Sequence, residues 1–444
     1  MNTVKKIITM LILASLLLNG CAMRTVDQLY SPPKRSEKYN HLQSAMDAVM
    51  TDLDYCAPLS GENQQTVQIA DLDGDGSPEY LVFAKGSGDN PLKILIFQEN
   101  GERFQLKNTI ESSGYAFEQV EYIHFDGKAG CELVVGRQVS DQVLRSVSIY
   151  SFGEDSLETL MTGGYSKFLT CDLDNDNMSE VFLLHPGQTE SDNGVAELFS
   201  WGENGVERST EVNLSEPVDH IKRIMVSRLD GGVPAVYVAS AVAETAMITD
   251  VFALVDGKFS NVSLSNESGT SVKTLRNYYV YANDIDNDGV IELPSLINMY
   301  APRDAAQDNQ YLIRWYAMNI RGEEVDKRYT YHNFGGGWYL CLDEAWASRV
   351  SVEQYTIDAE GQQFEFYVWN EADQKAEHLL TLYALTGDNR EEKAIEDNRF
   401  ILYKTESAVY AANLEGASVS YGLDQQTLTD WFSMIRMDWK TGET

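Results

Sequence analysis

The hydrophobic and polar positions of this chain alternate in a pattern that repeats along most of its length. Between residues 66 and 331, short apolar runs are separated by turns rich in Gly, Asn and Asp. Such runs predict β-strands, and Asn-Gly or Asp-Gly pairs between them predict tight hairpins. Five runs precede a turn that contains Gly: residues 92–97, 147–152, 196–201, 251–255 and 312–316.

An acidic loop of one design recurs among these runs. It occupies residues 71–79, 172–180 and 284–292, and an apolar strand-like run follows each copy. The three loops start 101 and 112 residues apart, and degenerate copies at 124–132 and 228–236 lie near the middle of these two intervals. The repeat period is therefore about half of each interval, roughly 50 to 56 residues. Four strands in each period are typical of a β-propeller blade. The sequence therefore predicts a mainly β fold, with a propeller-like array of about five four-stranded repeats over residues 66–331.

The acidic loops predict calcium sites. Carboxylates at loop positions 1, 3 and 5, a backbone carbonyl at position 7 and a Glu at position 9 offer the all-oxygen ligands that calcium prefers. Position 6 needs a residue that tolerates positive φ, and it holds Gly76, Asn177 and Gly289. The predicted ligands are Asp71, Asp73, Asp75, Ser77 and Glu79; Asp172, Asp174, Asp176, Met178 and Glu180; and Asp284, Asp286, Asp288, Val290 and Glu292.

A different interpretation of the loops stays open. Asx-turns satisfied by water use the same residue types, although they give no reason for the acidic ninth position to recur three times. The degenerate copies are expected to bind no calcium. In the first, the Lys128 ammonium is expected to take the place of the metal and pair with Asp126 and Glu132. In the second, Gly232 and Val236 replace two ligands.

The D-x-D-x-D-G-x-x-E loops, each followed by a strand, resemble VCBS or FG-GAP repeats, which occur in bacterial surface proteins and in the head of integrin α chains. The resemblance implies propeller blades with calcium held in loops between strands. The whole layout, which includes the N-terminal features described next, resembles VCBS-repeat lipoproteins from Firmicutes-type bacteria.

The N-terminus resembles a bacterial lipoprotein signal. Lys5 and Lys6 precede an apolar run at 7–18, and Leu18-Asn19-Gly20-Cys21 follows. The run is too short to span a bilayer as a stable helix. We therefore expect a signal peptide at 1–20, lipidation of Cys21 and a tether at 21–35. A secretory signal with a chance Cys and a signal anchor are the alternatives.

The charge balance restricts the partners. The net charge is −34, and loss of two Lys with residues 1–20 would make it −36. Such a chain repels nucleic acid and anionic headgroups, so acyl chains and not a basic patch would attach it to the membrane. The expected location is the extracellular face of the cell membrane, or the periplasmic side or outer membrane of a host with two membranes.

Two further regions flank the repeats. Residues 36–65 predict a helix and a lead-in, in which Leu42, Met46 and Val49 recur at helical spacing. Residues 338–444 predict a small α+β domain that ends in an amphipathic helix at 424–439. Gly335-Gly336-Gly337 is interpreted as a flexible joint before that domain.

No hydrolase elbow, zinc-protease helix, phosphate-binding loop or dinucleotide fingerprint occurs in the sequence. The six His residues are scattered, and Cys56, Cys131, Cys171 and Cys341 match no metal spacing. Free buried thiols are favoured for these four, with three disulfide pairings as the alternative. Most of the aromatic residues are expected in cores, with a glycan-binding face as the alternative.

We therefore expect a lipid-anchored, extracellular calcium-binding protein that acts as a rigid binding or adhesion scaffold for a protein or polysaccharide, and not an enzyme. Two alternatives stay open at this point. One is a calcium-dependent enzyme acting on envelope polysaccharides, which should gather acids or His from several blades in a cleft. The other is an accessory subunit of an envelope complex.

Overall fold

The computed structural model describes residues 37–101, 103–140, 145–153, 156–189, 192–278, 280–300, 311–357 and 361–435. They form two compact units. One contains the described part of Met1–Ala57 with Gln65–Ala70 and Ser77–Ser113, and the other contains Pro58–Gln64, Asp71–Gly76 and the described residues from Gly114 onward. The predicted signal peptide, tether and Cys21 lie outside the described residues. Among the described residues, no helix is long and apolar enough to cross a membrane.

The first unit is one helix on one antiparallel sheet. Helix α3 (Glu37–Val49) buries Leu42 and Met46 against Tyr80 and Phe97, as the helical spacing predicted. The sheet has the order β1-β3-β4-β5, with β2 also paired to β3. Its strands are β1 (Asp54–Tyr55), β2 (Val67–Ala70), β3 (Glu79–Lys85), β4 (Leu92–Asn100) and β5 (Arg103–Ser112).

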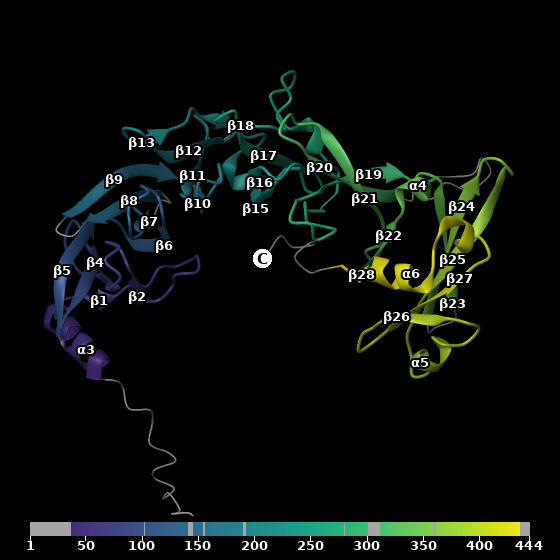
Figure 1. The fold of residues 1–444 in the computed structure, drawn as a ribbon, viewed down its shortest axis with the longest axis horizontal. Helices are drawn as coiled ribbons and strands as arrows, with labels where there is room; N and C mark the ends of the chain where they lie inside the picture. Colours follow the sequence, from purple (N-terminus) through teal and green to yellow (C-terminus); the bar gives the residue numbers. More distant parts are fainter. Residues whose placement is uncertain are drawn as a thin grey trace, which may run out of the picture. The chain divides into compact units, whose positions relative to one another are not determined.

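Three antiparallel sheets open the second unit, and each is built from strands that are consecutive in the chain (Figure 1). The first contains β6 (Ala116–Ile123), β7 (Glu132–Gln138), β8 (Arg145–Gly153) and β9 (Ser156–Tyr165). The second contains β10 (Lys167–Cys171), β11 (Glu180–His185), β12 (Val195–Gly202) and β13 (Gly205–Arg208), with β14 (Val212–Asn213) on β12. The third contains β15 (Ile221–Arg228), β16 (Pro234–Ala241), β17 (Met247–Val255) and β18 (Lys258–Asn261). Short 3₁₀ helices, η1 (Val218–His220) and η2 (Val272–Thr274), lie in the connections.

The fourth sheet of this unit corrects one interpretation. It has the order β19-β20-β21-β22-β28, with β19 (Leu293–Asn298), β20 (Tyr311–Met318), β21 (Glu324–Asn333), β22 (Trp338–Leu342) and β28 (Phe432–Met434). Residues 335–337 are therefore a hairpin turn within one sheet and not a flexible joint. The Gly337 N–H donates to the Asn333 carbonyl at 2.9 Å, and the Gly336 N–H donates to Asn333 Oδ1 at 2.6 Å.

The last sheet has the order β23-β24-β25-β27-β26. Its strands are β23 (Val350–Ile357), β24 (Gly361–Asn370), β25 (Lys375–Leu385), β26 (Phe400–Lys404) and β27 (Val409–Leu414). The helices near it are α4 (Glu344–Ala347), α5 (Arg390–Lys393), η4 (Ser418–Tyr421) and α6 (Gln425–Trp431).

The predicted helix at 424–439 is wrong at residues 432–435. Asp424 caps α6 by accepting the Thr427 N–H, but Phe432 is extended and starts β28, which pairs with β22. Burial of the Phe432 ring against Trp338, with the ring centroids 5.6 Å apart, outweighs the helical period. Residues 436–439 lie outside the described part of the chain.

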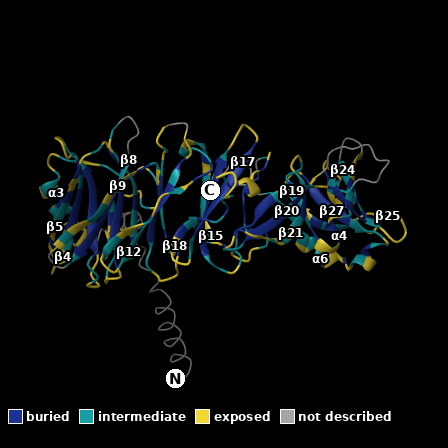
Figure 2. Ribbon diagram, turned by 90° about the horizontal axis from the view of Figure 1, so that it is seen from above, coloured by how far each residue is buried: buried dark blue, intermediate teal, exposed yellow. Residues whose placement is uncertain are grey.

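Apolar side chains fill the space between successive sheets of the second unit. Phe182 of one sheet meets Phe252 of the next edge to face, with centroids 5.4 Å apart. Trp338 meets Phe364 of the last sheet in the same way, at 5.0 Å. Figure 2 shows the buried residues along the strands and the exposed ones mostly in the turns. The expected mainly β fold with four-stranded antiparallel sheets is confirmed, and the five predicted apolar runs lie in β4, β8, β12, β17 and β20.

Candidate metal centres

The three acidic loops lie at equivalent places in the chain, each ahead of a strand whose first two residues are buried. Residues 71–79 join β2 to β3, and residues 172–180 join β10 to β11. In the third copy, the strand before the loop is reduced to a single bridge. Asn283 and Glu292 exchange two backbone hydrogen bonds there, at 3.0 and 2.9 Å. The ninth residue of each loop is thus fixed by the start of the sheet.

The position 1 carboxylate folds each loop. Asp172 Oδ1 accepts the Asn175 N–H at 2.7 Å, and its Oδ2 accepts the Asn177 N–H at 3.0 Å. Asp71 accepts the N–H groups of Gly74 and Gly76 in the same way, at 2.8 and 3.0 Å. These are the Asx-type bonds of the alternative interpretation, and they also hold the carboxylate in one orientation.

Positive φ is required at two positions of each loop, and only one of them was predicted. Position 6 has φ of 85° at Gly76, 69° at Asn177 and 85° at Gly289, as expected. Position 4 is also left-handed, with φ of 72°, 62° and 60° at Gly74, Asn175 and Asn287. The recurrence of Gly or Asn at position 4 was the signal that could have revealed this second turn.

The structure gathers three of the five predicted ligands in each loop. One ligand oxygen from each of positions 1, 3 and 9 lies within 4.8 Å of the other two. The groups are Asp71, Asp73 and Glu79; Asp172, Asp174 and Glu180; and Asp284, Asp286 and Glu292. Positions 5 and 7, which are Asp75, Ser77, Asp176, Met178, Asp288 and Val290, are not part of these groups, and their role as ligands stays a prediction.

Position 5 makes a local contact instead. Asp176 Oδ1 accepts the Met178 N–H at 2.7 Å, and Asp288 Oδ1 accepts the Val290 N–H at 2.8 Å. The side chains at this position are exposed in all three loops. A carboxylate here can still supply its second oxygen to an ion.

The Glu at position 9 is the buried member of each group. Glu292 is fully buried, and Glu180 is 3% exposed. Each accepts one backbone N–H through Oε2, from Ile285 at 2.9 Å and from Leu173 at 2.7 Å. Burial, together with the neighbouring loop carboxylates, raises the pKa of Glu180 to about 7 and that of Glu292 to about 8. The raised pKa values show that the carboxylates of Glu180 and Glu292 have no nearby positive charge among the described residues strong enough to offset their burial.

The donor set fits a hard cation. Glu292 Oε1 and Asp286 Oδ1 are both buried, and neither has a hydrogen-bond partner among the described residues. Buried carboxylate oxygens without a hydrogen-bond partner, on two residues of one acidic cluster, are what a bound metal ion would satisfy. Asp284, Asp286 and Glu292 would hold the ion in the third loop, and the corresponding residues would do so in the other two. The ion would neutralise the carboxylates and link the loop to the start of the strand.

The first degenerate loop contains an internal cation. Lys128 Nζ contacts Asp126 Oδ2, as predicted, and the Asp126 side chain is completely buried. Glu132 does not bond Lys128. Its Oε2 accepts the Phe125 N–H at 2.8 Å, and Ser151 Oγ donates within 3.2 Å to both carboxylates. Ser151, on β8, was missed because nothing in its local sequence links it to a loop 19 residues away.

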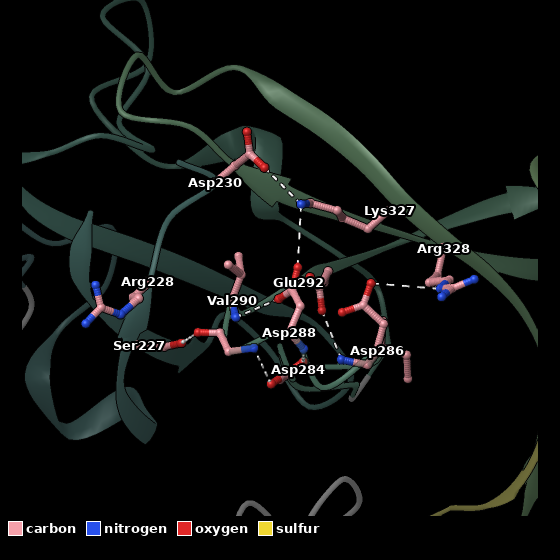
Figure 3. A network of polar contacts seen from close by, with 12 residues as sticks. Ser227, Arg228, Asp230, Asp284, Asp286, Asp288, Val290, Glu292, Lys327 and Arg328 are labelled. Atoms are coloured by element: carbon pink, nitrogen blue, oxygen red, sulfur yellow. Dashed lines mark hydrogen bonds and ion pairs between the residues drawn. The ribbon is translucent and has the colours of Figure 1, made fainter. Parts of the chain in front are cut away.

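The second degenerate loop is tied to the third acidic loop (Figure 3). Lys327, on β21, lies between them, with Nζ 2.9 Å from Asp230 Oδ1 and 3.7 Å from Asp288 Oδ2. The next residue, Arg328, places Nε 3.9 Å from Asp286 Oδ2. The third loop therefore has two basic neighbours that the sequence did not indicate.

The cysteines support the free-thiol interpretation. Cys56, Cys131, Cys171 and Cys341 are all free. Burial raises the pKa of the Cys171 thiol to about 12 and that of Cys341 to about 11, so both stay protonated near neutral pH.

Comparisons with solved structures find distant structural neighbours of this chain. No family model matches the chain, and no curated protein sequence matches it. Among solved structures, the exotype rhamnogalacturonan lyase YesX is 11% identical with a TM-score of 0.33, and the match covers 82% of this chain and 63% of the lyase. TolB from Acinetobacter baumannii is 10% identical with a TM-score of 0.24, over 76% of this chain and 68% of TolB. The chain thus spans less than two thirds of the length of the lyase.

Proposed function

We propose that this chain is a calcium-stabilised binding scaffold, held by lipid on the outer face of a cell membrane, whose sheets present a rigid surface to a protein or polysaccharide. The observation that carries the proposal is the third acidic loop. There the fully buried Glu292 and the partly buried Asp286 each have one buried carboxylate oxygen without a hydrogen-bond partner among the described residues. Their carboxylates belong to one cluster with Asp284. The same arrangement of residue types recurs in the other two loops.

Calcium has a structural role in this proposal. External sites of this kind have dissociation constants of about 10⁻⁴ to 10⁻³ M. At ten times its dissociation constant, each independent site adds about 1.4 kcal/mol to the free energy of unfolding, so three sites add roughly 4 kcal/mol. For a chain with a net charge of −34, the six positive charges of three calcium ions also reduce self-repulsion.

The sheets are proposed to be propeller-like blades, of the kind found in VCBS and FG-GAP repeat proteins. Support comes from five successive sheets that each contain four strands consecutive in the chain, and from an acidic loop directly ahead of a strand in three of them. Stacking of one sheet on the next through apolar side chains also agrees with blades.

A lipid on Cys21 is proposed as the membrane anchor, on the evidence of the Leu18-Asn19-Gly20-Cys21 sequence alone. The proposal assigns the chain no catalytic role. At the metal centres, the carboxylates of the described residues act as loop ligands and as ion-pair partners of neighbouring cations.

Thermal unfolding and calorimetric counting of calcium test the proposal. The full-length protein in detergent should bind about three calcium ions, and its Tm should rise by several degrees over the value in chelator. Magnesium at the same concentration is the matched control, since its octahedral, strongly hydrated coordination fits these loops less well. No bound calcium and no change in Tm would leave the loops as water-filled turns and overturn the proposal.

A further inference from the structure

A cleft of about 640 Å³ lies in the second unit, away from the acidic loops. The first strands of three successive sheets, β6, β10 and β15, contribute to its walls. Each of these strands is an edge of its sheet, so its side chains can reach a shared space. A volume of this size accommodates a ligand of one to three sugar rings. The polar side chains that matter to the argument are Glu118, Arg145, Tyr165, Lys167, Lys222 and Arg223.

The charge of the cleft is opposite to that of the chain. The protein has 68 acidic and 34 basic residues, yet the described lining holds four cations and one carboxylate. If the charged residues of the cleft followed the composition of the whole sequence, acidic residues would outnumber basic ones there. A concave site with one sign of charge focuses the electrostatic potential and raises the local concentration of a counter-ion.

The one carboxylate is already engaged. Glu118 Oε1 lies 3.6 Å from Arg145 Nη2, and its Oε2 accepts a hydrogen bond from the Gln138 side chain. Neither Lys167 nor Lys222 forms an ion pair with another residue in the described part of the chain, and both are exposed. At least two positive charges of the lining, those of Lys167 and Lys222, are therefore left without an ion pair in this part of the chain.

The two guanidinium groups are held in place. Arg145 Nη1 donates to the Ser166 carbonyl at 2.9 Å, and Arg223 lies over the Tyr281 ring, 5.7 Å from its centre. Such anchoring lowers the entropy that binding an anion would cost. The lysines, in contrast, can adjust to the ligand.

Two buried donors add to the positive potential. Tyr165 is 8% exposed, and neither its hydroxyl nor Arg145 Nε has a hydrogen-bond partner among the described residues. A buried donor without an acceptor is costly in a protein that only needs to fold. An anion in the cleft would offset that cost electrostatically.

We propose that this cleft binds the anionic group of a sugar-sized ligand, a carboxylate or a phosphate, through Arg145, Lys167, Lys222 and Arg223. The inference rests on the proposed binding function, because it assigns a site and a charge to the ligand of that scaffold. A uronic acid and a sugar phosphate share this chemistry, and the experiment separates them.

Calorimetry with three probes at low salt tests the site: cellobiouronic acid, its neutral counterpart cellobiose, and inorganic phosphate. The full-length protein should bind an anionic probe and not cellobiose. Binding of the disaccharide acid alone identifies a carboxylate sugar, and binding of phosphate identifies a phosphate-bearing ligand. The double variant Lys167→Gln/Lys222→Gln should weaken binding by about tenfold or more, since a hydrogen bond to a charged group contributes about 1.5–3 kcal/mol.

Lys258→Gln is the control, because Lys258 is exposed and lies outside the cleft. Both variants carry exposed substitutions, and an unchanged Tm in calcium will establish that they are folded. Failure of the full-length protein to bind either anionic probe would overturn the inference, as would equal affinity in the double variant. If calcium still binds and still raises the Tm in that case, the proposed function survives. If the full-length protein binds neither calcium nor an anionic probe, the proposed function and this inference are overturned together.

Discussion

Lys327 places its ammonium 2.9 Å from the carboxylate of Asp230, a residue almost one hundred positions earlier in the chain. The contact joins β21 to the second degenerate loop, and it holds the same ammonium 3.7 Å from Asp288 of the third acidic loop. A positive charge beside a predicted calcium ligand opposes the binding of a second cation. The third loop should therefore be the weakest of the three proposed calcium sites.

Lys327→Met should tighten calcium binding at the third loop. To isolate that loop, the substitution is made in an Asp73→Asn/Asp174→Asn background. Removal of a partly exposed ion pair of this kind is expected to raise the affinity by about threefold to tenfold, or about 0.7–1.4 kcal/mol. Calorimetry gives the affinity directly, and Lys258→Met is the matched control. Equal or weaker affinity in the variant would contradict the role assigned to Lys327.

Glu292→Gln should separate calcium binding from folding. The amide keeps the shape of the side chain and cannot ionise, so the Tm in chelator should stay the same or rise. The stoichiometry should fall by one ion because the ligand at position 9 is lost. Asp256→Asn is the control, since Asp256 lies in a hairpin turn with φ of 50°, a conformation that Asn tolerates. A calcium count unchanged by Glu292→Gln would remove the third loop from the list of sites.

Lys128→Met should destabilise the protein in the presence and in the absence of calcium. The substitution leaves the fully buried Asp126 carboxylate with Ser151 but without its cation. The expected loss is about 1–2 kcal/mol in the free energy of unfolding. Chemical denaturation of the variant, the unsubstituted chain and Lys258→Met measures it. A loss that disappears in chelator would mean that Lys128 acts through a metal site instead.

His332 should make the fold sensitive to acid. Burial lowers its pKa from an ordinary value near 6.5 to about 3, beside the ring of Tyr339 at 5.1 Å. The folded state therefore binds its proton only at lower pH than the unfolded state does. The contribution of neutral His332 to the free energy of unfolding is complete above pH 6.5. It is lost as the pH falls toward 3, and the loss is about 3 kcal/mol at pH 4.

The variant His332→Phe keeps an aromatic ring and removes the titration. Its free energy of unfolding should fall less between pH 6.5 and pH 4 than that of the unsubstituted chain, as measured by urea denaturation at each pH. Equal slopes for the two proteins would show that His332 is not the group responsible.

Cys21→Ser should release the protein from membranes. The prediction follows from the Leu18-Asn19-Gly20-Cys21 sequence, in which the thiol would carry the lipid. Fractionation of expressing cells should find the variant in the soluble or secreted fraction. If the variant still sediments with membranes, the attachment is a signal anchor or a protein partner.

Local patterns were sufficient for much of the site. Hydrogen bonds that span only a few residues hold Asp172 and Glu180 in the loop, and Gly or Asn supplies the positive φ at position 6. A nine-residue sequence is therefore enough to specify the loop. Position 5 was assigned to the metal on the same grounds, and this assignment stays a prediction. In the structure, one oxygen of Asp176 and one of Asp288 accept turn hydrogen bonds. A side chain with two oxygens can serve a turn or an ion, and spacing alone does not distinguish the two uses.

The sequence by itself determined the strand-and-turn repeat, the acidic loops and the helix α3, because these depend on short-range period, turn chemistry and local hydrogen bonds. Only the tertiary structure decided what lies beside each loop and which strands share a sheet. Residues 432–434 became a strand because Phe432 packs on Trp338, far away in the chain. Lys327 reached Asp230, and four cations met in one cleft, for the same reason. Contacts between distant residues are set by the packing of whole sheets, which leaves no periodic trace in the sequence.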